Sequence, residues 1–576
     1  MKMTAHPLFK DIFNEPKPHL EELIKGLPSE MIITFLCNIN AKLKFASFSK
    51  DDQLEILMLL LQGQQEEYKK QLFINTLTFY ERNEDNVVLF SSKFTLDFMH
   101  HEIMNFRDFE RNSVEEPRQF LNLIKAYFLF MENTSESLFK NQTFTKSPAD
   151  SIHDHFRKKV WPTFFEQIES QHKPEIYPVM IRGVAFLELL KRDGKYKSYV
   201  ESYLKIYEAE TPWKYAFKVM KLLEVGLSVK NREVSFPNSA INYSEEYATM
   251  LDNLTLNIEE YQLSYSNNKA NYNGFKSKPL IKFQGGDRYL VTDWNMMYNK
   301  FNDGLLFDFY ERSNIKELPE FKTFLDFKNF VGFEISERFL FRKVCEKIFP
   351  EKRKGKLIFP EGKGMPDAYY REGQNIMLIE FKDSLMAGNT ISSLSYEEIV
   401  KAIDTKYNTD SKGTGQLIKY IDKLKDSSFY EGSTNYKIKG RKDLVIYPVI
   451  IFTDKFFGVD GVSHYLSKQF EMKLHQSKLS DEFLSIKPLA CFDFNKMVSY
   501  FIALAESQDN LFDLIDRFNE RIKKRIRRAH ELNTFDSILG TQNSIESEFL
   551  NSLERKAVHN KGYLPKMVAH FDLPVN

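Results

Sequence analysis

The sequence predicts a mostly α-helical N-terminal region followed by an α/β core in which helices flank a mixed central sheet. Apolar residues recur at helical spacing through the first 240 residues. Two strand-like runs around a turn cluster lie between residues 367 and 381, and a further apolar strand covers residues 444–452. We therefore expect four segments: a helical domain (1–240), a small α+β connector (241–325), the α/β core (326–500) and a C-terminal helical segment (501–576).

The composition is that of an ordinary globular protein. The 576 residues are 28% charged and 42% hydrophobic, enough for several domains and a large core. The formal net charge is +0, so any basic surface that binds nucleic acid must be local. The three cysteines, Cys37, Cys345 and Cys491, are too far apart for a disulfide framework or a zinc motif. This spacing favours a reducing, cytoplasmic location.

No segment of the sequence predicts a membrane partner. The N-terminus has no signal-peptide core. The longest apolar runs, such as Ile56–Leu61, are far shorter than the roughly 20 residues that span a bilayer.

The N-terminal helices are predicted from capping residues, helix-ending residues and apolar periodicity. Ser49 is expected to cap one of them. Two histidine pairs lie in this region, His100 with His101 and His153 with His155, but no carboxylate is clearly spaced to complete a metal site with either. We expect ordinary packing or surface histidines there. The helices predicted in this region cover residues 18–24, 50–61, 66–80, 117–131 and 212–225.

The connector contains a strong hairpin signal. Residues 280–283 and 288–293 are strand-like and flank the turn cluster Gln284-Gly285-Gly286-Asp287. The α/β core then opens with a long helix from residue 326, which Pro350 ends.

The start of the core carries two further features. Glu334 and Glu337 lie on similar faces of the long helix. Beyond the helix, a basic run precedes a short strand at 357–359. The cations of this run could contact phosphates or could form a solvated loop, and they are Lys352, Arg353, Lys354 and Lys356.

The stretch from Gly364 to Lys382 is the centre of the prediction. If Gly373 and Gln374 form a two-residue hairpin loop, Asp367 directly faces Glu380. Lys382 follows Glu380 by two residues and leaves the strand on the same side. Two carboxylates and an amine then converge. A structural Glu–Lys pair at a strand end would leave the same pattern.

The rest of the core places further polar residues after this hairpin. An insertion at 383–413 contains a capping box at Ser395 and a helix to about Lys406. Gln416 and Tyr420 share a face of the next helix. The strand at 444–452 contains Pro448, for which we expect a bulge or an edge position.

Two features close the chain. Residues 486–494 predict the last strand. The basic run 521–528 could follow a phosphate backbone or form a solvated helix face.

Pro366-Asp367 and Glu380-Phe381-Lys382 resemble the signature of the PD-(D/E)xK nuclease superfamily, over roughly residues 325–500. The helix with Gln416 and Tyr420 resembles the branch that includes RecB-like and lambda-exonuclease-like nucleases. The resemblance implies that the α/β core is restriction-endonuclease-like.

The resemblance also implies roles for individual residues. Asp367 and Glu380 would hold Mg²⁺ or Mn²⁺, with the Phe381 carbonyl and Glu334 completing the oxygen shell. Lys382 would orient or deprotonate the attacking water. Gln416 would support the metal site, and Tyr420 would contact the substrate.

The function expected from this resemblance is metal-dependent phosphodiester hydrolysis, endo- or exonucleolytic, on DNA rather than RNA. The chain could be a restriction-like or anti-phage effector whose N-terminal domain recruits a protein partner or regulates cleavage. Two alternatives stay open: an RNase, and a non-catalytic nucleic-acid-binding or scaffold protein that retains the nuclease fold.

Overall fold

The computed structural model describes sixteen stretches of the chain, and every structural statement below concerns them. Within this part of the chain, no helix combines the length and the apolar character needed to cross a membrane. The described stretches are residues 6–45, 49–83, 87–107, 117–140, 152–171, 175–227, 239–265, 272–283, 286–349, 355–362, 364–393, 395–425, 441–507, 510–532, 535–545 and 562–573.

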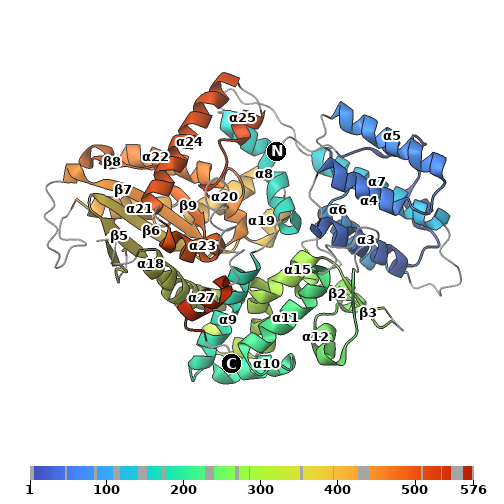
Figure 1. The fold of residues 1–576 in the computed structure, drawn as a ribbon, viewed down its shortest axis with the longest axis horizontal. Helices are drawn as coiled ribbons and strands as arrows, with labels where there is room; N and C mark the ends of the chain where they lie inside the picture. Colours follow the sequence, from blue (N-terminus) through green and yellow to red (C-terminus); the bar gives the residue numbers. More distant parts are fainter. Residues whose placement is uncertain are drawn as a thin grey trace. The chain divides into compact units, whose positions relative to one another are not determined.

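The chain folds into two compact units whose segments alternate along the sequence (Figure 1). Unit 1 comprises Met1–Thr145, Ser170–Lys173 and Glu201–Asp308. Unit 2 comprises Lys146–Glu169, Pro174–Val200 and Phe309–Asn576. The predicted helical domain 1–240 is therefore shared between the two units. The division falls within three helices, α8 (Ile152–Gln171), α10 (Lys197–Ile206) and α16 (Asp303–Arg312).

Unit 1 is helical with a small antiparallel sheet. The predicted hairpin is confirmed, because β2 (Leu280–Ile281) pairs with β3 (Arg288–Val291), and β1 (Ala240–Asn242) pairs on the other side of β3. The predicted cap of α4 is also confirmed, since the Ser49 hydroxyl accepts from the Asp52 amide at 3.2 Å. One apolar core joins helices within residues 9–131 to the sheet.

The helices of unit 1 include all five predicted ones. They are α1 (Phe9–Phe13), α2 (Leu20–Ile24), α3 (Ser29–Phe45), α4 (Lys50–Leu60), α5 (Glu66–Arg82), α6 (Ser92–Met104), α7 (Pro117–Lys140), α11 (Pro212–Leu227), η2 (Glu245–Tyr247), α12 (Ala248–Asn253), α13 (Ile258–Tyr265), α14 (Asn273–Ser277), α15 (Trp294–Tyr298) and η3 (Asn299–Phe301).

Unit 2 contains the predicted mixed sheet flanked by helices. Its strands are β4 (Lys356–Ile358), β5 (Ala368–Glu372), β6 (Asn375–Lys382), β7 (Val445–Phe452), β8 (Ser485–Ile486) and β9 (Ala490–Asp493). The order is β4-β5-β6-β7-β8, and β9 also pairs with β7. The pairs β4–β5 and β5–β6 are antiparallel, and β7 pairs in parallel with β6, β8 and β9.

Helices cover both faces of this sheet, with α20 (Tyr396–Tyr407), α21 (Thr414–Lys423) and α22 (Val462–Ser477) on one face and η6 (Gly332–Phe341) and α23 (Phe494–Glu506) on the other. The other helices that lie wholly in unit 2 are α9 (Ile176–Arg192), η4 (Ile315–Glu317), η5 (Pro319–Phe321), α17 (Phe324–Val331), α18 (Arg342–Ile348), α19 (Gly388–Ser392), η8 (Arg441–Asp443), η9 (Lys455–Gly458), η10 (Leu479–Glu482), α24 (Leu511–Leu532), α25 (Phe535–Leu539) and α27 (Tyr563–His570).

Side-chain alternation along β6 assigns its residues to the two faces. Ile376 and Leu378 belong to the core that also contains residues of α20, α21 and α22. On the opposite face, Phe381 stacks on Phe341 of η6 at 4.9 Å between ring centroids and meets Phe494 of α23 edge-on at 5.1 Å. Glu380 shares the parity of Ile376 and Leu378, so its side chain leaves the strand toward α21.

The expectation for Pro448 was wrong. Pro448 lies inside β7, paired with Leu378 of β6, in neither an edge strand nor a bulge. On its other side, β7 pairs with β8 at Val445 and Ile446 and with β9 from Val449 onward. The neighbouring strand is therefore interrupted beside Pro448. A residue without an N–H is tolerated there because no ladder partner faces it.

The predicted long helix of the core is confirmed and contains a π-helical middle. It runs through α17, η6 and α18, and η6 is the π-helix. A capping box begins it: the Thr323 hydroxyl accepts from the Asp326 amide at 3.2 Å, and the Asp326 carboxylate accepts from the Thr323 amide at 3.1 Å. Helical stretches of this kind often occur at functional sites.

Candidate active site

The β5–β6 hairpin brings Asp367 and Glu380 together as the sequence predicted. The ladder pairs Ala368 with Ile379, so Asp367 precedes β5 at the position facing Glu380. The Asp367 Oδ2 atom accepts a hydrogen bond from the Phe381 amide at 2.7 Å. This bond fixes the carboxylate at the end of β6.

Glu380 is held by two side chains. Lys382 forms an ion pair with its Oε1 atom, and the Tyr420 hydroxyl donates to Oε2 at 2.9 Å. Glu380 is only 1% exposed, whereas the Lys382 side chain is 21% exposed. A buried carboxylate needs such partners, because an isolated buried charge is strongly destabilising.

The start of α21 positions Tyr420 through a chain of hydrogen bonds. The Gly413 amide donates to Gln416 Oε1 at 3.0 Å, and Gln416 Nε2 donates to the Tyr420 hydroxyl at 3.1 Å. Gly413 has a φ of +56°, and a Cβ added at Gly415 would lie 2.2 Å from the Thr409 carbonyl oxygen. Both positions therefore require glycine. Burial and the Glu380 carboxylate raise the pKa of Tyr420, which keeps the hydroxyl protonated as a donor.

Glu337, rather than Glu334, interacts with this group. Burial and the negative charge of Glu380 raise the pKa of Glu337 to about 6, while Lys382 and two arginines oppose the shift. Glu334 instead pairs with Arg338 at 3.2 Å, and its side chain is 39% exposed. The resemblance assigned Glu334 to the metal, with Glu337 as its competitor on a similar face of the helix. The interactions of the π-helix favour Glu337.

Asp367 carries an electrostatic cost at this site. Burial, followed by the charges of Glu380 and Glu337, raises its pKa well above its usual range. Lys382 and the Phe381 amide only partly offset this. Three carboxylates thus repel one another beside a single ammonium group.

A network that the sequence did not predict anchors the helix that carries Glu337. Asp383, directly after β6, forms a buried ion pair with Lys328 at 2.7 Å and accepts from the hydroxyls of Ser336 and Thr453, at 2.7 and 2.5 Å. Burial is the largest single effect on the Asp383 pKa and would raise it, but the charges of Lys328 and Arg182 and the hydrogen bonds from Lys328 and Thr453 together lower it. A Cβ at Gly332 would lie 3.3 Å from this carboxylate, so glycine permits the close approach.

The carboxylate oxygens of Asp367, Glu380 and Glu337 are suitable ligands for a hard divalent cation, although they do not form a complete coordination shell. Carboxylate oxygens are the ligands that Mg²⁺ and Mn²⁺ prefer, and mutual repulsion is what a cation would relieve. Across the described stretches, no group of three or more His, Cys, Asp or Glu side chains is arranged to hold a metal. The Lys382–Glu380 ion pair uses one of the oxygens such a group would need.

The structure says less about the predicted phosphate-contacting and substrate-contacting residues. Lys352, Arg353 and Lys354 lie outside the described residues, and Lys356 is half-buried at the start of β4. Tyr420 is 1% exposed, with its hydroxyl directed to Glu380. The metal-ligand role of the Phe381 carbonyl stays a prediction.

Two of the predicted packing histidines have protein partners. His100 Nδ1 lies 2.7 Å from the Tyr261 hydroxyl, and His153 Nδ1 lies 3.1 Å from Gln542 Nε2. These contacts agree with the expectation of packing roles.

Comparisons of the chain with protein-family models, with curated proteins and with solved structures returned no match.

Proposed function

We propose that this protein is a metal-dependent nuclease that hydrolyses phosphodiester bonds in DNA, with a restriction-endonuclease-like core. The observation that supports this most is the group formed by Asp367, Glu380 and Lys382 at the end of the β5–β6 hairpin. It unites acidic oxygens with an amine around the buried Glu380 carboxylate, where an uncompensated charge is unfavourable. Groups placed at such a cost are often functional.

Each residue has a distinct role in this proposal. Asp367, Glu380 and Glu337 would hold Mg²⁺ or Mn²⁺, which supplies a Lewis acid for the phosphoryl oxygen. Lys382 orients the attacking water and donates a hydrogen bond to the developing negative charge. Tyr420, positioned by Gln416, keeps Glu380 in place.

Cations beside the site would contact the phosphates. The positive charges of Arg338 and Arg342 both oppose the rise in the pKa of Glu337. Arg338 lies over the ring of Phe333 at 4.3 Å, and Arg342 over that of Phe359 at 5.1 Å. These two arginines offer positive charge of the kind that DNA backbone binding needs.

Cleavage of a substrate panel tests the proposal. Supercoiled plasmid, linear duplex, single-stranded DNA and RNA are each incubated with Mg²⁺, Mn²⁺ or EDTA. The Lys382→Ala protein is compared with Lys419→Ala, a control that removes an exposed lysine from α21. We expect metal-dependent cleavage of DNA that only Lys382→Ala abolishes. Wild-type cleavage by Lys382→Ala would overturn the assignment.

Other outcomes would identify the alternatives. Cleavage of RNA alone would indicate an RNase. Binding of DNA without cleavage by the wild type, under every metal condition, would indicate the non-catalytic protein. A restriction-like or anti-phage role, with regulation by the N-terminal helices, is the biological setting that we propose for the nuclease.

A further inference from the structure

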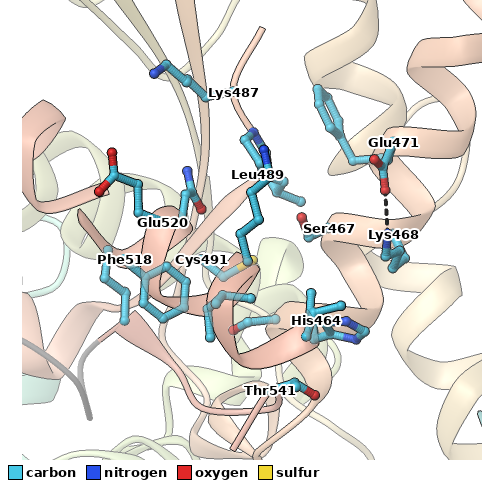
Figure 2. A pocket seen from close by; sticks show the side chains of 18 of the residues that line it. His464, Ser467, Lys468, Glu471, Lys487, Leu489, Cys491, Phe518, Glu520 and Thr541 are labelled. Carbon is cyan, nitrogen blue, oxygen red and sulfur yellow. Dashed lines mark hydrogen bonds and ion pairs between the residues drawn. The ribbon is translucent and has the colours of Figure 1, made fainter. Parts of the chain in front are cut away.

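A cavity of about 770 Å³ lies in unit 2 away from Asp367 and Glu380. It is formed by α22, the connection between β8 and β9, α24 and residues 541–545, as Figure 2 shows. Its volume is within the roughly 300–1,000 Å³ usual for small-molecule sites. The walls are mainly apolar and include Phe470, Leu474, Ile486, Leu489, Ile522 and Ile526.

Four cations line this cavity, and two of them have ion-pair partners. Lys468 pairs with Glu471 at 2.7 Å, and Lys487 pairs with Asp516 at 2.8 Å. Lys523 and Arg527 also line the cavity, and neither forms an ion pair in the described part of the chain. They stand one turn apart on the same face of α24.

The charged side chains lie on opposite sides of the cavity. Lys468 and Glu471 lie on one side and Glu520 on the other (Figure 2). Glu520 is exposed and offsets one of the two unpaired cations. Lys523 and Arg527 therefore leave one net positive charge among the side chains that line the cavity.

Two lining residues carry buried polar atoms for which no described residue is a hydrogen-bond partner, His464 Nε2 and Asn519 Nδ2. Burial, His153 and Arg157 lower the pKa of His464 to about 3, so its ring is neutral. Its Nδ1 atom lies 3.2 Å from Arg157, whose guanidinium can only donate. The ring proton of His464 is therefore on Nε2. Both unpartnered atoms are donors, and unsatisfied buried donors are rare.

We propose that this cavity binds a mononucleotide, with its phosphate on Lys523 and Arg527 and its nucleoside against the apolar walls. A phosphate offers several acceptor oxygens, and an arginine can engage two of them at once. The apolar walls suit a flat base, and the donors of His464 and Asn519 suit the acceptors of a base or sugar. Nothing in this proposal depends on the nuclease assignment.

The helix α24 provides a matched pair of variants. Lys523→Ala/Arg527→Ala removes the two cations that line the cavity. Lys524→Ala/Arg528→Ala removes a lysine and an arginine with the same spacing from the same helix; both are exposed and neither lines the cavity. The two double variants have the same net charge and the same helix propensity.

The measurement is nucleotide binding to the full chain. Mono- and triphosphates of the four ribonucleosides are titrated calorimetrically in EDTA, in the Lys382→Ala background, so that cleavage at the proposed active site cannot contribute. We expect saturable binding of at least one nucleotide, weakened about tenfold or more by Lys523→Ala/Arg527→Ala and unchanged by Lys524→Ala/Arg528→Ala.

A third variant tests whether the nucleotide occupies the apolar interior of the cavity. Ser467 lines the cavity, so Ser467→Phe should fill it and weaken binding while an unchanged melting temperature shows that the fold is kept. The lack of saturable binding for every nucleotide would overturn the proposal. So would equal weakening by the two double variants, because α24 would then attract anions only through its surface charge.

Discussion

The charge of Asp367 is needed for the proposed function but lowers the stability of the fold. We predict that Asp367→Asn raises the melting temperature in EDTA at pH 8, because it removes a charge that burial and Glu380 disfavour. The asparagine oxygen can still accept from the Phe381 amide. The same variant should lose cleavage and any stabilisation by Mg²⁺, both measured on the full chain.

The sign of the pH dependence follows from this shift. An acid whose pKa is raised by folding binds more protons in the folded state. Its contribution to stability is therefore full below about pH 4, the unfolded pKa of aspartate, and is lost as the pH rises through the folded pKa. The gain in melting temperature from Asp367→Asn should accordingly be larger at pH 8 than at pH 5. An equal gain at both values would contradict this explanation.

Substitutions of Glu337 and Glu334 test which of the two glutamates of the π-helix binds the proposed cation. We predict that Glu337→Gln lowers the cleavage rate about a hundredfold or more, because the proposed cation loses a carboxylate. Glu334→Gln should leave the cleavage rate within about a factor of three, since the Glu334 carboxylate forms an exposed ion pair with Arg338. Single-turnover cleavage by both variants measures this, and the reverse ranking would favour Glu334 as the ligand.

The residues that sequence could predict are those related by simple geometry. The alternation of a strand and a two-residue loop suffice to bring Asp367 opposite Glu380 and Lys382 beside it. Glu337 could not be separated from Glu334 in this way, because an α-helical argument does not hold inside a π-helix. Asp383 gave no sign of its role, since Lys328 and Thr453 are distant in sequence.

At the scale of elements, the buried pair Lys328–Asp383 fixes the helix that carries Glu337 against the end of β6. Both side chains are 5% exposed or less. Lys328→Ala should destabilise the protein by about 3–5 kcal/mol, because it leaves a buried carboxylate without its partner. Lys221→Ala breaks a pair with Glu224 in which both side chains are more than 60% exposed, and should cost less than about 1 kcal/mol.

Chemical denaturation of these two variants measures the difference. A third variant, Lys328→Ala/Asp383→Asn, should recover part of the loss, because the remaining charge is also removed. Equal destabilisation by Lys328→Ala and Lys221→Ala would show that the buried pair does not hold the helix.

Element boundaries were predictable where local signals were strong and not where tertiary pairing decides. Ser49, Thr323 and Ser395 begin helices that their own side chains cap. The last strand of the sheet was expected as one piece over residues 486–494, but it is split into β8 and β9. The split accompanies Pro448 in the neighbouring strand, and strand pairing cannot be read from a single segment.

At the scale of the whole molecule, the alternation of the two units limits how the chain can be divided. Trp161 and Phe165 of α8 are fully buried in the core of unit 2. In α9, Phe186 packs on Phe327 with 6.0 Å between ring centroids, and Arg182 donates to Asn495 at 2.8 Å. We predict that residues 241–576, expressed alone, do not unfold cooperatively, because the fragment lacks both helices.

Thermal unfolding of this fragment, beside the full chain, tests the prediction. A cooperative transition at the temperature of the full chain would show that α8 and α9 are dispensable. Local periodicity predicted the helices of this region as one domain, because it carries no information on which unit a helix joins.

The strands at the two sides of the six-stranded sheet are short. On one side β4 spans Lys356–Ile358, and on the other β8 and β9 are separated by Lys487, Pro488 and Leu489. A long, flat edge with unpaired amides is the usual template for fibrous aggregation. In the described part of this chain the sheet presents none, although β7 at its centre is almost wholly apolar. We therefore expect the interruption beside Pro448 to hinder polymerisation of the protein, strand by strand, in a concentrated solution.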